Sequence, residues 1–281
     1  MIAPRPASFL VIVLIIDCVG AYAQSDLPAP APAAAAPVGT DIASELNSGQ
    51  DAAIADAERQ IRENFASGTT PYALWRNWLP SLMNTHHYQQ AADLSIEIAV
   101  QRPAVETIVP LLEFRVKALL ALNRDKEALG AAKSYYNVCA LKDTGAALDL
   151  IEKCLKDKDE VFRFRAEQAT ASRAAANGAG NAPTNSFLKS VHVDPQPYAK
   201  AFETWKEHPQ SVEYANLLLA ADRPAEAEAI FRELFKSAPA AGLPVCIEGI
   251  ARSLRAEDGN VARADAWLLA LQNSASSPAI H

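Results

Sequence analysis

The stretch AEAEAIFRELF, residues 225–235, decides the fold that this sequence predicts. Four of its apolar side chains recur at the spacing i, i+3, i+4, i+7: Ala227, Ile230, Phe231 and Leu234. This spacing places them along one face of an α-helix. Pro224 suits the first turn of that helix, and Pro239 lies just beyond its last turn. Because residues 212–221 have the pattern of a helix as well, the two segments predict a helical hairpin.

The same layout recurs along the chain. Alanines mark it at a spacing of 37 residues in each of two pairs: Ala91 with Ala128, and Ala227 with Ala264. A leucine stands nine residues before three of these alanines: Leu82, Leu119 and Leu218. Self-similarity at this period is typical of stacked helical pairs.

These segments resemble the tetratricopeptide repeat, a family of helix–turn–helix units of about 34 residues. The matching units are Tyr214–Pro239, Trp75–Pro103, Leu112–Tyr136 and Ile247–Leu271, the last with a lengthened turn expected at Ala256–Val261. The family has a small residue where the first helix crosses its partner closely. Ala215 fits that pattern, whereas Leu79 and Val116 depart from it, and Pro80 inside a first helix is expected to kink it. The resemblance implies an all-α fold of stacked antiparallel hairpins, a TPR-like α-solenoid in two blocks.

The blocks are separated by a change in composition. Residues 51–170 form the predicted N-terminal block, and residues 195–273 form the C-terminal block. Between them, residues 171–194 collect Gly, Asn and Pro and predict a flexible linker. Residues 274–281 are predicted to be a disordered tail. Aromatic residues are only 7% of the chain, so we expect packing to be concentrated at six of them: Trp75, Trp78, Phe162, Trp205, Phe231 and Trp267.

The N-terminal residues have the three parts of an export signal. Arg5 supplies the positive charge, residues 9–16 are a short apolar run, and Ala21-Tyr22-Ala23 offers a cleavage site. The run is too short to cross a bilayer, and Asp17 interrupts its extension. Residues 1–23 are therefore predicted to be a signal peptide, and residues 24–50, rich in Pro and Ala, a disordered tether. The predicted location is periplasmic or secreted.

Three cysteines remain once the predicted signal is removed: Cys139, Cys154 and Cys246. An odd number excludes complete pairing within one chain. If a tight turn near residues 142–145 joins two antiparallel helices, Cys139 and Cys154 are offset along the helix axes by about 12 Å, against a Cα limit of about 7 Å for a disulfide. Buried free thiols are the favoured prediction, and a disulfide between Cys139 and Cys154 is the alternative.

The charges and motifs do not indicate catalysis or nucleic-acid binding. With 26 Lys and Arg against 33 Asp and Glu, the net charge of −7 excludes a basic nucleic-acid footprint. The histidines lack the spacing of metal ligands, and His86-His87 falls in a predicted turn. Ser186 and Lys189 match the S-x-x-K pattern of some acyl-transfer enzymes, but the companion motifs are missing. We therefore predict a protein that is not an enzyme and has no cofactor or metal.

The predicted architecture itself creates a surface for binding. First helices of stacked hairpins line an inner face that suits a peptide or a partner helix. The candidate groove residues on that face are Arg76, Met83, Glu113, Lys117 and Asn216. The sequence thus predicts an exported, non-catalytic scaffold that binds a protein or peptide partner in the cell envelope. The alternatives are ordinary surface residues at these positions, a structural subunit that acts by self-association, or an enzyme whose site is not recognisable from local motifs.

Overall fold

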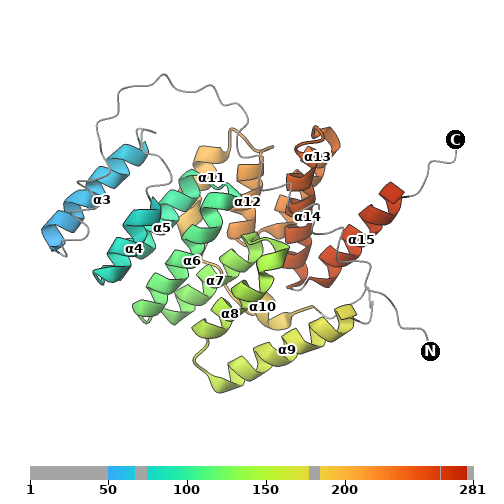
Figure 1. Ribbon diagram of the computed structural model, residues 1–281, viewed down its shortest axis with the longest axis horizontal. Helices are drawn as coiled ribbons and strands as arrows, with labels where there is room; N and C mark the ends of the chain where they lie inside the picture. The colour runs from blue at the N-terminus through green and yellow to red at the C-terminus, as the bar shows by residue number, and fades with distance from the viewer. Residues whose placement is uncertain (1–49, 67–74, 177–183, 260, 277–281) are drawn as a thin grey trace.

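Helices make up all the regular structure in the part of the chain that the computed structural model describes (Figure 1). The described residues are 50–66, 75–176, 184–259 and 261–276. The predicted all-α class is confirmed for these ranges. The predicted signal at 1–23 and the tether up to residue 49 lie outside them, as do residues 277–281 of the predicted tail.

Four helical hairpins share the same form. They are α4 (Trp75–Asn84) with α5 (Tyr88–Gln101), α6 (Val105–Ala121) with α7 (Asp125–Val138), α12 (Val212–Ala220) with α13 (Pro224–Ser237), and α14 (Leu243–Asp258) with α15 (Ala262–Ser276). Within each pair the two helices pack on one another, and α5 also packs on α6 and α13 on α14. The alanines of the repeat lie at these contacts and are fully buried: Ala91, Ala128, Ala227 and Ala264.

The hairpin turns have one backbone geometry. The residue five positions before each repeat alanine has a positive φ: 64° at His86, 57° at Asn123, 60° at Asp222 and 67° at Gly259. In three turns the next amide donates to the carbonyl of the repeat leucine, as from His87 N to Leu82 O at 2.8 Å. This is the Schellman ending of a helix, which satisfies carbonyls that the last turn leaves open. The repeat inferred from the sequence is therefore also a repeat of backbone structure.

The fourth turn corrects one expectation from the sequence. A lengthened turn was expected at Ala256–Val261, but α14 continues to Asp258 and α15 begins at Ala262. Gly259 stands in the same register as the positive-φ residues of the other turns. Glycine adopts this conformation without steric cost, and the interval between α14 and α15 has the same length as in the other hairpins.

Six further elements complete the described chain: α3 (Asp51–Ala66), the 3-10 turn η3 (Leu141–Asp143), α8 (Thr144–Cys154), α9 (Lys158–Ala176), α10 (Ser186–Ser190) and α11 (Gln196–Trp205). The helix α9 contains Phe162, one of the aromatic residues at which packing was expected. The aromatic residue that α9 buries is not the one that was expected. Phe162 is 73% exposed, whereas Phe164 is buried, with its ring centroid 5.3 Å from that of Phe187.

Residues 184–194 differ from the flexible linker predicted at 171–194. They include α10, and Leu188, Val191 and Val193 are buried. The segment crosses α7 so closely that a Cβ at Gly130 would lie 2.8 Å from the carbonyl oxygen of His192. Glycine at position 130 is therefore what lets this backbone lie against α7.

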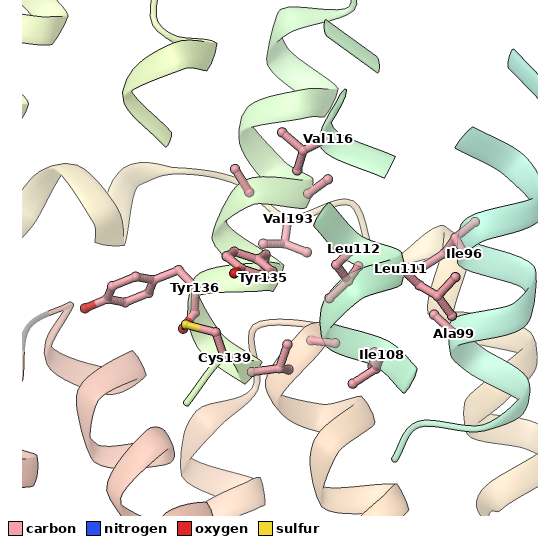
Figure 2. Packing of buried hydrophobic residues seen from close by; sticks show 14 of the residues in the cluster. Ile96, Ala99, Ile108, Leu111, Leu112, Val116, Tyr135, Tyr136, Cys139 and Val193 are labelled. Carbon is pink, nitrogen blue, oxygen red and sulfur yellow. The ribbon is translucent and has the colours of Figure 1, made fainter. Parts of the chain in front are cut away.

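The two predicted blocks are joined through α7. This helix packs on α6 and α8 of its own block and also on α12 and α14 of the other (Figure 1). Side chains of α7 contact both blocks. In Figure 2, Tyr135 and Val193 lie beside Leu112 of α6, whereas Tyr136 points away from that cluster toward the faint red helices. The helix α7 is thus central to any site that depends on both blocks.

Candidate functional site

Two buried arginines of α14 stand at repeat positions that hold apolar residues in the other hairpins. Arg255 lies nine residues before Ala264, where the other hairpins have the repeat leucine. Arg252 lies three residues earlier, at the position of Leu79, Val116 and Ala215 in the other hairpins. The exposed fractions of Arg252 and Arg255 are 1% and 0%.

The two arginines bind the carboxyl end of α7. Arg255 donates to the backbone oxygens of Cys139 at 2.8 Å and Asn137 at 3.2 Å, and also to that of Tyr136. Arg252 Nη1 donates to Val138 O at 2.9 Å. The last carbonyls of a helix lack partners within it and carry the negative end of the helix dipole. The arginines supply both hydrogen bonds and compensating positive charge there.

A second set of contacts binds the end of α12 to α7. Ser134 Oγ donates to Ala220 O at 2.6 Å, and Asn137 Nδ2 donates to Leu219 O at 3.2 Å. Lys133 Nζ forms an ion pair with Asp222 at 2.7 Å and donates to Val191 O at 3.0 Å. Each block therefore caps a helix end of the other. We call both sets of contacts together, those of Arg252 and Arg255 and those of Lys133, Ser134 and Asn137, the polar joint.

Asn216 belongs to the polar joint, so its predicted place in an exposed groove is wrong. Its side chain is 0% exposed. Asn216 Nδ2 donates to Pro103 O at 2.9 Å, and its Oδ1 accepts from Arg252 Nη2 at 3.1 Å. Burial lowers the pKa of Arg252 to about 10. The helix α12 is covered by the other block, which the local sequence pattern does not reveal.

The other predicted groove residues lie on α4 and α6. Arg76 is exposed, and Met83 is half-buried against the core. Glu113 and Lys117 form an ion pair with each other at 2.7 Å, one helical turn apart. These four residues do not line the cleft described next.

A cleft of about 690 Å³ lies between α7, the junction of α8 with α9, and residues 187–198. Its floor is apolar and includes Leu129, Ala131, Leu155, Phe187, Val191 and Val193. The lining also includes charged side chains: Arg115, Asp125, Lys126, Glu127, Lys156, Asp157, Glu160 and Asp194. The cleft was not foreseen, because it is built from segments far apart in the chain, one of which was predicted to be a linker.

The polar joint holds one wall of this cleft in place. Ser134 lines the cleft and donates to Ala220 O, and Lys133 binds the carbonyl oxygen of Val191, another lining residue. Tyr198, also on the cleft, is buried, and burial raises the pKa of its hydroxyl. Its hydroxyl is hydrogen-bonded to Ser134 and, like that of an ordinary tyrosine, is neutral at neutral pH.

The sequence features that were considered for catalysis have ordinary partners. Ser186 Oγ donates to Glu167 at 2.7 Å, and Lys189 is exposed. His86 Nδ1 contacts the Tyr88 hydroxyl at 2.6 Å, and His87 Nε2 lies 3.2 Å from Asp51. The described residues contain no group of three or more His, Cys, Asp or Glu side chains placed to hold a metal ion.

The cysteines within the described residues, Cys139, Cys154 and Cys246, are buried free thiols. Burial raises the pKa of Cys154 to about 12, and it raises the pKa values of Cys139 and Cys246 as well. The favoured prediction of unpaired buried cysteines agrees with this arrangement. A thiol with a raised pKa is a poor nucleophile near neutral pH, because the thiolate is the reactive form.

Comparison with protein-family models, with curated proteins and with solved structures found no match to this chain. The likeness to the tetratricopeptide repeat therefore stays a prediction. Within residues 50–66, 75–176, 184–259 and 261–276, no helix combines the length and the apolar character needed to cross a membrane.

Proposed function

We propose that this chain is a non-catalytic helical-repeat scaffold that binds a peptide or protein partner through the cleft beside α7. The observation that carries the proposal is the cleft itself, with an apolar floor and charged residues in its lining. Its volume of about 690 Å³ lies within the range of about 300–1,000 Å³ that is usual for ligand pockets. A peptide can bury apolar side chains on such a floor and pair polar groups at the edge.

The polar joint supports this proposal because it fixes the cleft before a partner arrives. Lys133 connects Val191 on the cleft wall to Asp222 at the end of α12. A preformed site avoids the ordering cost that a flexible segment adds to binding. The cell envelope is the proposed location, because residues 1–23 are predicted from the sequence to be an export signal. The TPR-like stacking of the hairpins is part of the same proposal, and the shared turn geometry supports it.

The test uses one substitution at two sites. Leu129→Lys places a charge on the cleft floor, and Leu269→Lys makes the same change at a side chain that is 59% exposed on α15, outside the cleft. Both variants and the parent chain are cross-linked in an envelope fraction, and captured proteins are quantified by mass spectrometry. Thermal unfolding checks that each variant is folded. We expect Leu129→Lys to lose a specific captured protein and Leu269→Lys to retain it.

A third variant, Arg76→Glu with Lys117→Glu, separates the cleft from the groove that the sequence predicted. If only this double variant loses the captured protein, the partner binds on α4 and α6 and the cleft proposal is wrong. An unchanged capture profile in all three folded variants excludes both the cleft and the predicted groove as the binding site. Light scattering over a range of protein concentrations detects self-association, the alternative function.

A further inference from the structure

The carboxylates near the cleft have partners of their own. Asp125 pairs with Lys156 at 2.7 Å, and Glu127 pairs with Arg124 at 2.5 Å. The side chains of Asp157 and Asp194 are exposed and accept from backbone amides two residues further along. Glu160 lies 4.0 Å from Arg163, so each of these carboxylates is paired or exposed, although one oxygen of Asp125, Oδ1, is buried without a hydrogen-bond partner.

Arg115 differs from them because it is only partly exposed and lacks an ion pair. This arginine of α6 donates from Nη1 to Ala92 O at 2.8 Å, and among the described residues no carboxylate forms an ion pair with it. A guanidinium has five N–H donors in a planar fork, and the hydrogen bond to Ala92 O uses one of them. Burial lowers the pKa of Arg115, yet an arginine stays protonated at neutral pH.

This arrangement favours an anion inside the cleft. The carboxylates of Asp93 and Glu127 raise the pKa of Arg115 without forming an ion pair with it. A partly buried charge with no carboxylate in direct contact interacts more strongly with an incoming opposite charge than an exposed one does. The fork of an arginine matches the two oxygens of a carboxylate. Tyr198 lines the same cleft, and its buried hydroxyl is hydrogen-bonded to Ser134.

We propose that Arg115 binds the carboxylate of an acidic side chain in a peptide whose apolar residues lie on the cleft floor. The inference rests on the proposed function, since it names the chemistry of the partner that the cleft takes. A peptide fits better than a small carboxylate because the floor at Leu129, Leu155 and Phe187 needs apolar surface to cover it. An acidic side chain can extend inward from a backbone that lies along the open mouth of the cleft.

The experiment compares two libraries of short synthetic peptides that differ at one position. All peptides are acetylated and amidated, so no terminal charge is present; the central residue is Glu in one library and Gln in the other, and the flanks are drawn from Ala, Leu, Val and Ser. Binding to the purified full chain is measured by affinity selection and then by fluorescence polarisation. We expect the best Glu peptides to bind at least about tenfold more tightly than their Gln partners, as for a charge-assisted hydrogen bond.

A variant at Arg115 tests whether this residue causes the preference for Glu peptides over Gln peptides. Arg115→Gln retains a donor for Ala92 O and should bind Glu and Gln peptides equally, whereas Lys126→Gln, which removes an exposed cleft cation, should keep the Glu preference. A thermal melt checks that both variants are folded. If Arg115→Gln does not fold, a Glu preference that added salt weakens but that both Lys126→Gln and Lys156→Gln retain assigns the charge to Arg115.

Each remaining outcome is decisive. Equal binding of Glu and Gln peptides by the parent chain overturns the role of Arg115 but leaves a peptide-binding cleft. Full competition by acetate, or by peptides with a free C-terminal carboxylate and no Glu, overturns the acidic side chain as the ligand. If neither library binds while Leu129→Lys still abolishes cross-linked capture, this inference fails and the proposed function stands. If the libraries and the capture both fail, the proposed function fails.

Discussion

Replacing Arg255 with methionine removes the cation at the end of α7 while keeping a similar apolar stem. The parent side chain donates to five acceptors: the backbone oxygens of Tyr136, Asn137, Cys139 and Ala140, and Thr144 Oγ1. Four of these are main-chain carbonyls that no substitution at position 255 can remove. The variant therefore leaves buried acceptors without donors, unlike the exchange of a whole ion pair for apolar residues, which is often neutral.

The size of the effect follows from two opposing contributions. Hydrogen bonds to a charged group are worth about 1.5–3 kcal/mol each, so several are lost together. Against this, the variant recovers the cost of burying a guanidinium, which is several kcal/mol for one ion. We expect a net loss of about 3–5 kcal/mol in the free energy of unfolding, the range found when one partner of a buried charged contact is removed. That is a large part of the roughly 5–15 kcal/mol total of a typical domain.

Urea unfolding followed by far-ultraviolet circular dichroism measures this loss. The matched control is Arg232→Met on α13, because Arg232 is an exposed arginine whose ion pair with Glu228 at 2.6 Å spans one helical turn. Such pairs contribute about 0.3–0.5 kcal/mol, so the control should hardly change stability. A loss at Arg255→Met below about 1 kcal/mol would refute the reasoning, because water would then be satisfying the end of α7.

Three further predictions concern stability. His86→Gly relieves a positive φ of 64° and should raise the free energy of unfolding by about 1 kcal/mol; a lower melting temperature would contradict this. Gly249→Ala drives a Cβ into the ring of Phe231 and should cost about 1–3 kcal/mol in urea unfolding, whereas Gly145→Ala, with nothing within 4 Å, should be neutral or stabilising. Burial raises the pKa of Cys154 from 9.0 to about 12, so the folded state favours the neutral thiol, and stability present below pH 9 is lost as pH rises toward 12. Between about pH 8 and pH 10 this group should cost about 1 kcal/mol, and an equal loss in Cys154→Ala would exclude it as the cause.

The hairpins could be predicted because their signals are local. Helical periodicity, proline at helix ends and the spacing of the repeat alanines act within one or two helices, and the helices lie close to their predicted bounds. The positive φ at Gly259 could also have been found, since Gly259 stands five residues before Ala264 in the repeat. The register of Gly259 relative to Ala264 predicts a turn of ordinary length rather than a lengthened one.

The polar joint and the cleft could not be predicted because they depend on contacts between distant segments. Asn216 binds Pro103 O across 113 residues, and Arg255 binds Cys139 O across 116. One signal was present in the sequence: the repeat places Arg255 where the other hairpins have leucine, and a charged residue at a buried repeat position requires a partner. The apolar residues Leu188, Val191 and Val193 likewise argued against a solvated linker, but nothing local identifies α7 as the surface that they cover.

The substitution of arginine for leucine within an otherwise similar hairpin determines how the two blocks meet. Apolar packing is non-directional, so a leucine at position 255 would bury area against α7 without fixing where that helix ends. Hydrogen bonds require defined distances and angles, and those from Arg252 and Arg255 are formed only when the last carbonyls of α7 lie against α14. This placement brings Ser134 and Lys133 to the end of α12, and Lys133 in turn holds Val191 on the cleft wall. The position of the cleft is therefore set by polar contacts of the joint, and loss of Arg255 should weaken partner binding even though Arg255 does not line the cleft.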